Sequence, residues 1–406
     1  MTRKFLASLL ATIMFVPVLA QPSQFRGADR NGVYPESGLL DEWPDAGPRL
    51  IATIPEIGDG FAAPAITDQG IFVAGMKEST GYMHHFNHRQ ELQWSVPYGK
   101  EFTFKYTGAR STPTLEGDRL YYSGTFGDAF CMDVKDGSFI WKKNIFQEFG
   151  GNEIKWGYTE SPLIYEDLVI LTPGGPGHNV VALDKLTGNL RWSASADSTI
   201  NAYCSPMLIN HNNQDYILLN TRDYLLIIYA KTGEIAYRHP IYESHTMHAV
   251  TPLYADGKIF YSSGYGEGSV LFAMNKAEKR LDTIYVNPDL DCKLSGLIMV
   301  DGTVFGTSDR KKQWVGVDFS SGETVFTSRD LKPGSFLLAE NKFFIFTETG
   351  EVALAAPGPR GFSVISRFKS PAHPARYAFA HPVLFNGVLY IRYRGTLWLY
   401  DVSATY

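Results

Sequence analysis

Short runs of apolar, β-branched and aromatic residues recur along the chain and are separated by turns rich in Asp, Asn and Gly. Residues 120–122, 259–261 and 388–390 each follow such a turn and have the composition of a β-strand. The turns are short enough to join neighbouring strands as hairpins. Outside the first twenty residues, hardly any segment shows the helical period of about 3.6 residues. The pattern predicts an all-β protein.

One unit of this pattern repeats along the chain. A small or polar residue, usually followed by Pro, opens an apolar strand that leads through a turn into an aromatic-rich strand. Eight such anchors stand at positions 64, 113, 162, 206, 252, 296, 336 and 382, with a period of about 45 residues. Four short antiparallel strands in a period of this length are typical of a propeller blade. We therefore predict a single eight-bladed β-propeller of four-stranded antiparallel blades over residues 48–406.

The last blade is predicted to be closed by a strand from the N-terminal side. After the eighth anchor only three strands are expected, at Val383–Phe385, Val388–Tyr393 and Thr396–Val402. Pairing the two ends of the chain in one blade removes exposed sheet edges. We predict that Arg49–Ile54 supplies the fourth strand and that residues 21–47 form an extension packed on the ring.

The second half of several units has an aromatic residue at a fixed offset. Residues 182–192 read Ala-Leu-Asp-Lys-Leu-Thr-Gly-Asn-Leu-Arg-Trp, so that Trp192 follows Asp184 by eight positions with Gly188 between them. Asp133 and Trp141 repeat this offset. Glycine adopts the positive φ of a tight turn, and a large aromatic ring offers packing area. We predict that these aromatic residues dock each blade on the next one.

This repeat resembles the unit of the pyrroloquinoline-quinone-type (PQQ-like) propeller family, which ends in Ala-x-Asp-x-x-Thr-Gly-x-x-x-Trp. Residues 182–192 match that unit throughout, and residues 24–32 resemble the N-terminal signature of secreted members. The chain is similar to the propeller subunit of the bacterial outer-membrane assembly machine and, more distantly, to quinoprotein dehydrogenases. The resemblance covers nearly all of the chain after residue 20, and it is specific for fold rather than for function.

Residues 1–20 are predicted to be a cleavable signal peptide. Two basic residues precede an apolar run over 5–16, and Ala20 suits cleavage before Gln21. The run is too short to span a bilayer, and no other segment is predicted to do so. No Cys follows the cleavage site, where a bacterial lipoprotein carries its acylated Cys, and this argues against membership of the assembly machine. We expect a monomeric periplasmic or secreted protein that does not span the membrane.

Charge and cysteine content exclude further classes. The first twenty residues hold two of the 37 Lys and Arg and none of the 42 Asp and Glu, so the remainder has a net charge of −7. This charge disfavours nucleic acid and anionic membranes as partners. Cys131, Cys204 and Cys292 allow at most one disulfide, so disulfides do not organise the fold. Cys131 takes the small Ala position of its repeat, where we expect a buried packing residue.

Candidate binding residues lie just before the inner strands. The innermost strands of a propeller surround its axis, and the loops that lead into them form one axial face. Polar and aromatic side chains in those loops are expected to converge near the axis. The candidates for ligand or partner binding are Arg110, Trp156, Tyr158, Glu160, Asn201, Tyr203, His245 and His248. The alternative is that these groups hydrogen-bond to one another and to the inner-strand backbone.

Other motifs give weaker signals. Residues 172–178 form a glycine-rich loop that lacks the Gly-Lys-Ser/Thr of a phosphate loop, so a hairpin turn is predicted there. Histidines at 84, 85 and 88 would form a metal site only on a helix, and this segment is predicted to be a strand. The acidic loop 287–291 has too few ligands for Ca²⁺. No metal site and no catalytic residue is predicted.

Three functions remain open at this point. Our first hypothesis is an exported, cofactor-free propeller that is not an enzyme and binds a protein, peptide or glycan of the cell envelope through its axial face. The resemblance to quinoproteins implies the alternative of a PQQ-dependent dehydrogenase with Ca²⁺, for which Glu160 and Asn201 are the candidate metal pair. The quinoprotein disulfide between adjacent cysteines has no counterpart here, and we find no matching catalytic Asp. A polysaccharide hydrolase or lyase is the third, since Arg, Tyr, His and Glu suit acidic sugars.

Overall fold

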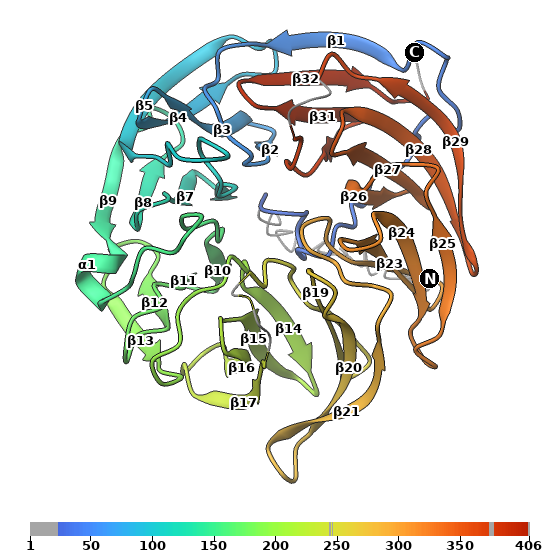
Figure 1. Ribbon diagram of the computed structural model, residues 1–406. Helices are drawn as coiled ribbons and strands as arrows, with labels where there is room; N and C mark the ends of the chain where they lie inside the picture. Colours follow the sequence, from blue (N-terminus) through green and yellow to red (C-terminus); the bar gives the residue numbers. More distant parts are fainter. Residues whose placement is uncertain (1–22, 243–244, 246, 373–376, 405–406) are drawn as a thin grey trace, which may run out of the picture.

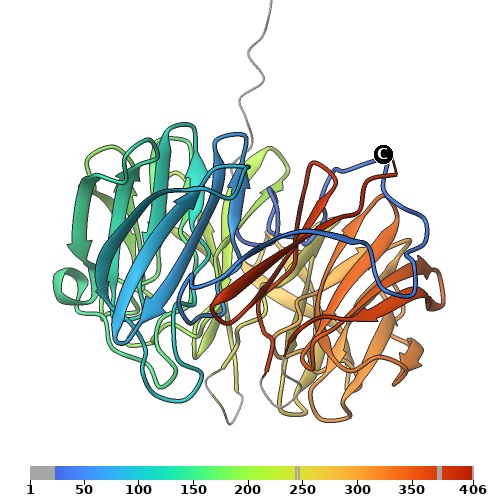
Figure 2. The same cartoon turned by 90° about the horizontal axis from the view of Figure 1, so that it is seen from above.

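The structure, a computed structural model, describes residues 23–242, 245, 247–372 and 377–404. In this part of the chain, strands β1 to β32 form eight four-stranded antiparallel sheets around a common axis (Figure 1; Figure 2 shows the ring turned by 90°). The eight-bladed propeller is therefore confirmed. The predicted signal peptide lies outside the described residues. No helix in the described ranges is long and apolar enough to cross a membrane.

The strands of each blade follow the chain from the axis outwards, except in the closing blade. The innermost strands are β2 (Ala65–Thr67), β6 (Thr114–Glu116), β10 (Leu163–Tyr165), β14 (Met207–His211), β18 (Leu253–Ala255), β22 (Ile298–Val300), β26 (Gly334–Ala339) and β30 (Val383–Phe385). The second strands are β3 (Gly70–Lys77), β7 (Arg119–Ser123), β11 (Leu168–Leu171), β15 (Gln214–Asn220), β19 (Lys258–Ser263), β23 (Thr303–Ser308), β27 (Lys342–Thr347) and β31 (Val388–Tyr393). The third strands are β4 (Thr80–Phe86), β8 (Asp128–Asp133), β12 (Val180–Asp184), β16 (Tyr224–Tyr229), β20 (Gly268–Asn275), β24 (Gln313–Asp318), β28 (Glu351–Gly358) and β32 (Thr396–Asp401). The outermost strands are β5 (Leu92–Lys100), β9 (Phe139–Asn144), β13 (Leu190–Ala194), β17 (Ile235–Pro240), β21 (Arg280–Asn287), β25 (Thr324–Ser328), β29 (Gly361–Lys369) and β1 (Arg49–Ile54).

Every anchor found in the sequence lies in an innermost strand or within two residues of one. The predicted closure is also confirmed, because β1 pairs antiparallel with β32 along the outer edge of the last blade (Figure 1). This blade joins the two ends of the described chain, so its pairing holds the ring shut.

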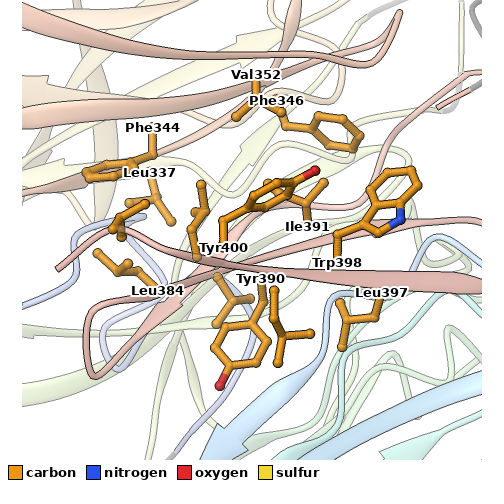
Figure 3. Close-up of a cluster of buried hydrophobic side chains, with 14 of the residues drawn as sticks. Leu337, Phe344, Phe346, Val352, Leu384, Tyr390, Ile391, Leu397, Trp398 and Tyr400 are labelled. Atoms are coloured by element: carbon orange, nitrogen blue, oxygen red, sulfur yellow. The ribbon is translucent and has the colours of Figure 1, made fainter. Parts of the chain in front are cut away.

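The blades are held together by apolar side chains that interleave between neighbouring sheets. Figure 3 shows the cluster between the closing blade and the blade of β26–β29, in which Phe344 and Phe346 face the closing-blade residues Trp398 and Tyr400. All four are almost fully buried. Trp43 joins the same cluster from the segment before β1, with its ring centroid 5.9 Å from that of Phe344. Burying large rings at each blade contact stabilises the ring as a whole.

The aromatic residues of the repeat hairpins dock on the next blade, as predicted. The indole Nε1 of Trp94 donates to the Val134 carbonyl 2.9 Å away, and that of Trp141 donates to the Lys185 carbonyl at 3.1 Å. The repeat Asp shapes the turn that receives the ring, since Asp184 Oδ1 accepts the backbone N–H groups of residues 186 and 187. The hairpin motif therefore specifies both a turn and an inter-blade contact.

The three cysteines are buried and free, so no disulfide crosses the blades. One short helix, α1 (Ile145–Phe149), was not predicted. Asn144 caps its first turn and Gly150 ends it with a φ of 68°. Five residues are too few for a helical period to be recognised in a sequence.

Candidate functional site

A cavity of about 330 Å³ opens on one axial face, where the loops between blades lead into the inner strands. We call it the axial cavity. Seven of the eight inter-blade loops contribute to its wall. The lining residues are Phe25, Phe61, Ala63, Lys105, Tyr106, Arg110, Thr112, Trp156, Thr159, Tyr203, Ser205, Met247, Ala249, Tyr265, Lys293, Leu294, Phe379 and His381. A volume of this size is within the range of small-ligand sites.

The N-terminal segment 24–34 lies inside the ring (Figure 1) and is hydrogen-bonded to the entries of the inner strands. We call it the N-terminal plug. Phe25 contributes its ring to the cavity wall and meets the His381 ring edge-on, with the centroids 5.2 Å apart. The plug also pairs with an inner strand, since Val33 bridges to Leu338 in β26, and Ser23, just before the plug, bridges to Leu115 in β6. The cavity therefore ends against the plug instead of passing through the ring.

Two buried arginines fasten the N-terminal plug to the inner strands. The Arg30 guanidinium donates to the carbonyl oxygens of Ser161, Pro162 and Pro206, which belong to two neighbouring blades. Arg26 donates to the Leu297 carbonyl at 2.8 Å, on another side of the ring. The short signature over residues 24–32 thus has a structural role that the sequence did not reveal.

Four aromatic residues of the cavity lining, Phe61, Tyr106, Trp156 and Phe379, form a group on one side of the axial cavity, and Tyr377 packs against two of them. We call these five residues the aromatic rim. The ring centroids of Tyr106 lie 5.9 Å from Trp156 and 5.7 Å from Phe379, and Tyr377 stacks on Phe379 at 5.3 Å. Tyr106 is 40% exposed and Tyr377 is 52% exposed. Only Trp156 of this set was predicted from the sequence. The five residues come from four loops and meet only in space.

Arg110 supports the rim from below. One of its terminal nitrogens donates to the backbone carbonyl of Tyr106, and its guanidinium lies 4.5 Å from the centroid of the Phe102 ring. Tyr106 has a φ of 59°, a left-handed conformation that costs energy for a residue with a side chain. The hydrogen bond from Arg110 helps to hold this loop in place. Burial lowers the pKa of Arg110 to about 10, so the group stays protonated at neutral pH.

Only three of the eight predicted site residues line the axial cavity, namely Arg110, Trp156 and Tyr203. Tyr158 is buried behind the wall, where its hydroxyl meets Thr172 Oγ1 at 2.9 Å. Asn201 is also buried and donates to the Thr172 carbonyl at 3.4 Å.

The two predicted histidines lie beside the wall and are not part of it. His248 is buried between the Ser263 hydroxyl at 3.2 Å and the Arg222 carbonyl at 3.1 Å. The His245 ring lies 4.5 Å from that of Tyr265, and its Nδ1 accepts the Met247 N–H. Both histidines thus contact groups of the protein, and neither is among the residues that line the axial cavity.

Glu160 is fully enclosed next to the cavity wall. Its carboxylate accepts the Tyr203 N–H at 3.1 Å and the Thr159 N–H at 3.0 Å, and burial raises its pKa to about 7. The folded state therefore holds the proton more tightly than the unfolded chain, where the carboxyl titrates near 4.5. The stability that this proton gives is complete at low pH and is lost as the pH rises through about 7.

We predict that Glu160→Gln removes this pH dependence. Between pH 4.5 and pH 8, the unfolding free energy of the wild type should fall by on the order of 2 kcal/mol relative to that of the variant. Urea unfolding of both proteins at the two pH values measures it. The control Glu234→Gln changes an exposed carboxyl and should give the same difference at both pH values. A constant difference for Glu160→Gln would contradict the prediction.

The donor set does not fit the Ca²⁺ of a quinoprotein cofactor. Glu160 is engaged by two backbone N–H groups, and neither Glu160 nor any other Asp or Glu is among the described residues that line the axial cavity. Asn201 Oδ1 is buried without a hydrogen-bond partner, but Asn201 does not line the cavity either. Within the described ranges, no group of three or more His, Cys, Asp or Glu side chains is placed to hold a metal ion. A glycoside hydrolase commonly uses a pair of carboxylates, and the residues that line the axial cavity in the described part of the chain include none.

The weaker motifs of the sequence have structural roles. The glycine-rich loop 172–178 is the turn between β11 and β12, as predicted. Two of the three clustered histidines, at positions 84 and 85, lie in β4, also as predicted. In the acidic loop, Asp289 pairs with Lys311 at 2.5 Å and Asp291 accepts the backbone N–H of Gly266 at 2.9 Å.

Comparisons with known proteins agree with this architecture. A family model described as outer membrane protein assembly factor BamB matches residues 79–328, which is more than half of the chain. The chain belongs to this family. A curated relative, the outer membrane protein assembly factor BamB of Kangiella koreensis, is 26% identical over 226 residues. That alignment covers 54% of this chain and only 52% of the relative.

Solved structures share the fold of this BamB-family chain. BamB from Moraxella catarrhalis superposes with a TM-score of 0.61 and 14% identity, over 87% of this chain and 99% of that one. A europium-containing methanol dehydrogenase gives the same TM-score at 10% identity, over 84% of each chain. At these identities the likeness is one of fold, and it is shared by assembly factors and enzymes alike.

Proposed function

We propose that this protein is a non-enzymatic binding module of the cell envelope that holds a protein partner at the aromatic rim. Membership of the BamB family supports the partner class, because relatives carry the name of outer membrane protein assembly factors. The predicted signal peptide supports a periplasmic location. The partner is then a protein that takes part in the assembly of outer-membrane proteins.

The single observation that carries the proposed site is the cluster of exposed rings at the aromatic rim. Tyr106 and Tyr377 leave about half of their surface in solvent, although they lie beside an apolar cavity that offers further contact area. Aromatic anchors that surround a pocket are the commonest energetic centres of protein interfaces. An exposed group of such rings on one face of the protein therefore favours a contact surface.

The proposal predicts a loss of function when the rim is removed. In a bacterium that carries this gene, its deletion should lower the amount of β-barrel proteins in the outer membrane. Wild-type protein should restore that amount, whereas the double variant Tyr106→Ser, Tyr377→Ser should restore less than about a tenth of it, since loss of two anchors costs several kcal/mol of binding. The matched control is Leu186→Ser, which removes a 51% exposed apolar residue from the β12–β13 turn.

Quantitative mass spectrometry of outer-membrane fractions measures these amounts. Photo-crosslinking from position 106, with position 186 as the control, then identifies the partner. An unchanged outer membrane after gene deletion would overturn the proposed function. Full rescue by the double variant would overturn the aromatic rim as its site.

A further inference from the structure

The axial cavity has a charge that differs from that of the whole protein. The chain has a formal net charge of −5, yet three of the described residues that line the cavity are Lys or Arg and none is Asp or Glu. His381 adds no charge, because burial and the nearby Arg26 lower its pKa to about 3. A low-dielectric cavity lined by cations alone attracts an anion and concentrates it.

Two of the cations are held in position by the protein. The Arg110 guanidinium rests on the Phe102 ring, and its Nε is buried and has no hydrogen-bond partner. A buried N–H without an acceptor is costly, so this guanidinium keeps an unused donor beside the cavity. Lys293 Nζ lies 4.1 Å from the Tyr265 ring centroid and 3.8 Å from the Asp309 carboxylate, which is outside the cavity lining. Its charge is therefore only partly offset by a loose ion pair.

The rest of the lining combines flat rings with hydroxyl groups. Tyr106 and Trp156 present rings to the opening, while Thr112 and Tyr203 place hydroxyl-bearing side chains on the same wall. Aromatic faces suit the C–H face of a sugar ring, and hydroxyl groups suit its polar edge. A simple aromatic acid would use the rings and the cations but not the hydroxyls.

We propose that the axial cavity binds a hexuronic acid unit of an acidic sugar. The sugar carboxylate lies toward Arg110 and Lys293, and the ring packs against Tyr106 and Trp156. Because the N-terminal plug closes the inner end, the cavity takes an end or a short branch of the sugar and not a strand that threads the ring. This inference does not rest on the proposed protein partner, although both sites use Tyr106 and Trp156 of the aromatic rim.

Titration calorimetry of the purified full-length protein with trigalacturonate tests the inference. Its methyl ester is the matched ligand that keeps the rings and hydroxyls but lacks the charge. We expect the acid to bind at least about tenfold more tightly than the ester, because hydrogen bonds to charged groups contribute more than neutral ones. The acid's affinity should also fall as salt is raised, and that of the ester should not.

Variants locate the carboxylate. Arg110→Gln should weaken acid binding by about tenfold or more and change ester binding by less than about twofold. Because Arg110 also holds the Tyr106 loop, Lys293→Gln serves as a second variant and should weaken acid binding by about three- to tenfold. Lys135→Gln, which removes an exposed charge on the β8–β9 turn, should leave both ligands unaffected.

Equal affinity for acid and ester, or no binding of the acid at 10 mM, would overturn the proposal. Tighter binding of 2-naphthoate than of trigalacturonate would overturn the sugar assignment in favour of an aromatic acid. Full acid affinity in folded Arg110→Gln and Lys293→Gln would also overturn it. None of these outcomes depends on outer-membrane protein levels, so the two proposals fail independently.

Discussion

Replacement of Arg30 by Met is expected to lower the free energy of unfolding by about 3–5 kcal/mol. The guanidinium donates to the carbonyl oxygens of Ser161, Pro162 and Pro206, and its Nε donates to Gln24 Oε1 at 2.8 Å. Met has a similar length but no donor, so these buried oxygens would lose their partner. Each unsatisfied buried polar group costs about 1–3 kcal/mol.

Urea unfolding at neutral pH measures this loss. The control is Arg49→Met, which breaks an exposed ion pair with Asp401 between β1 and β32. The Arg49 side chain is 64% exposed, and such pairs contribute less than about 1 kcal/mol. If both variants cost the same small amount, the N-terminal plug is not fastened to the blades in the way described here.

Gly188→Ala is expected to destabilise the protein by about 2–4 kcal/mol. Gly188 has a φ of 71° in the β12–β13 hairpin, and a Cβ at this position would lie 2.8 Å from Cδ2 of the Trp141 ring. Two costs therefore combine. One is the left-handed backbone of a residue with a side chain, and the other is displacement of the ring that docks two blades.

The matched control for this substitution is Gly177→Ala. Gly177 lies in the same blade with a φ of 79°, and a Cβ added there meets nothing within 4 Å. Gly177→Ala should therefore lower the unfolding free energy only by the cost of the left-handed backbone, about 1–2 kcal/mol. Urea unfolding of both variants measures the two losses. The additional loss in Gly188→Ala gives the cost of displacing the Trp141 ring from the blade contact. Equal losses in the two variants would show that Trp141 moves aside freely.

The repeat was readable from the sequence because each blade uses only local rules. Strand composition, turn residues and the offset from Asp184 to Trp192 act within one period of the chain, and eight periods repeat the same evidence. Closure by Arg49–Ile54 followed from counting strands in the last unit. The short helix α1 was not predicted, because a single turn is too short to show a helical period in the sequence.

The candidate site was less predictable, because its residues lie close together in space but do not form a motif in the sequence. Tyr106 and Phe379 belong to different blades, 273 positions apart in the chain, and face each other only after the ring has closed. Glu160 was a reasonable candidate by residue type, but its carboxylate turns to the backbone N–H groups of Thr159 and Tyr203. Burial and side-chain direction decide whether such a residue can reach a ligand, and neither can be read from the amino-acid sequence alone.

By itself, the sequence determined the fold class, the number of blades, the closing strand and the aromatic docking between blades. These features repeat, and each copy depends on residues close together in the chain. Only the tertiary structure decided that the N-terminal plug bounds the axial cavity and that the cavity wall holds cations without carboxylates. Both depend on loops from seven blades and on a segment that enters the ring from outside the repeats, so their chemistry emerges only where those distant parts of the chain meet.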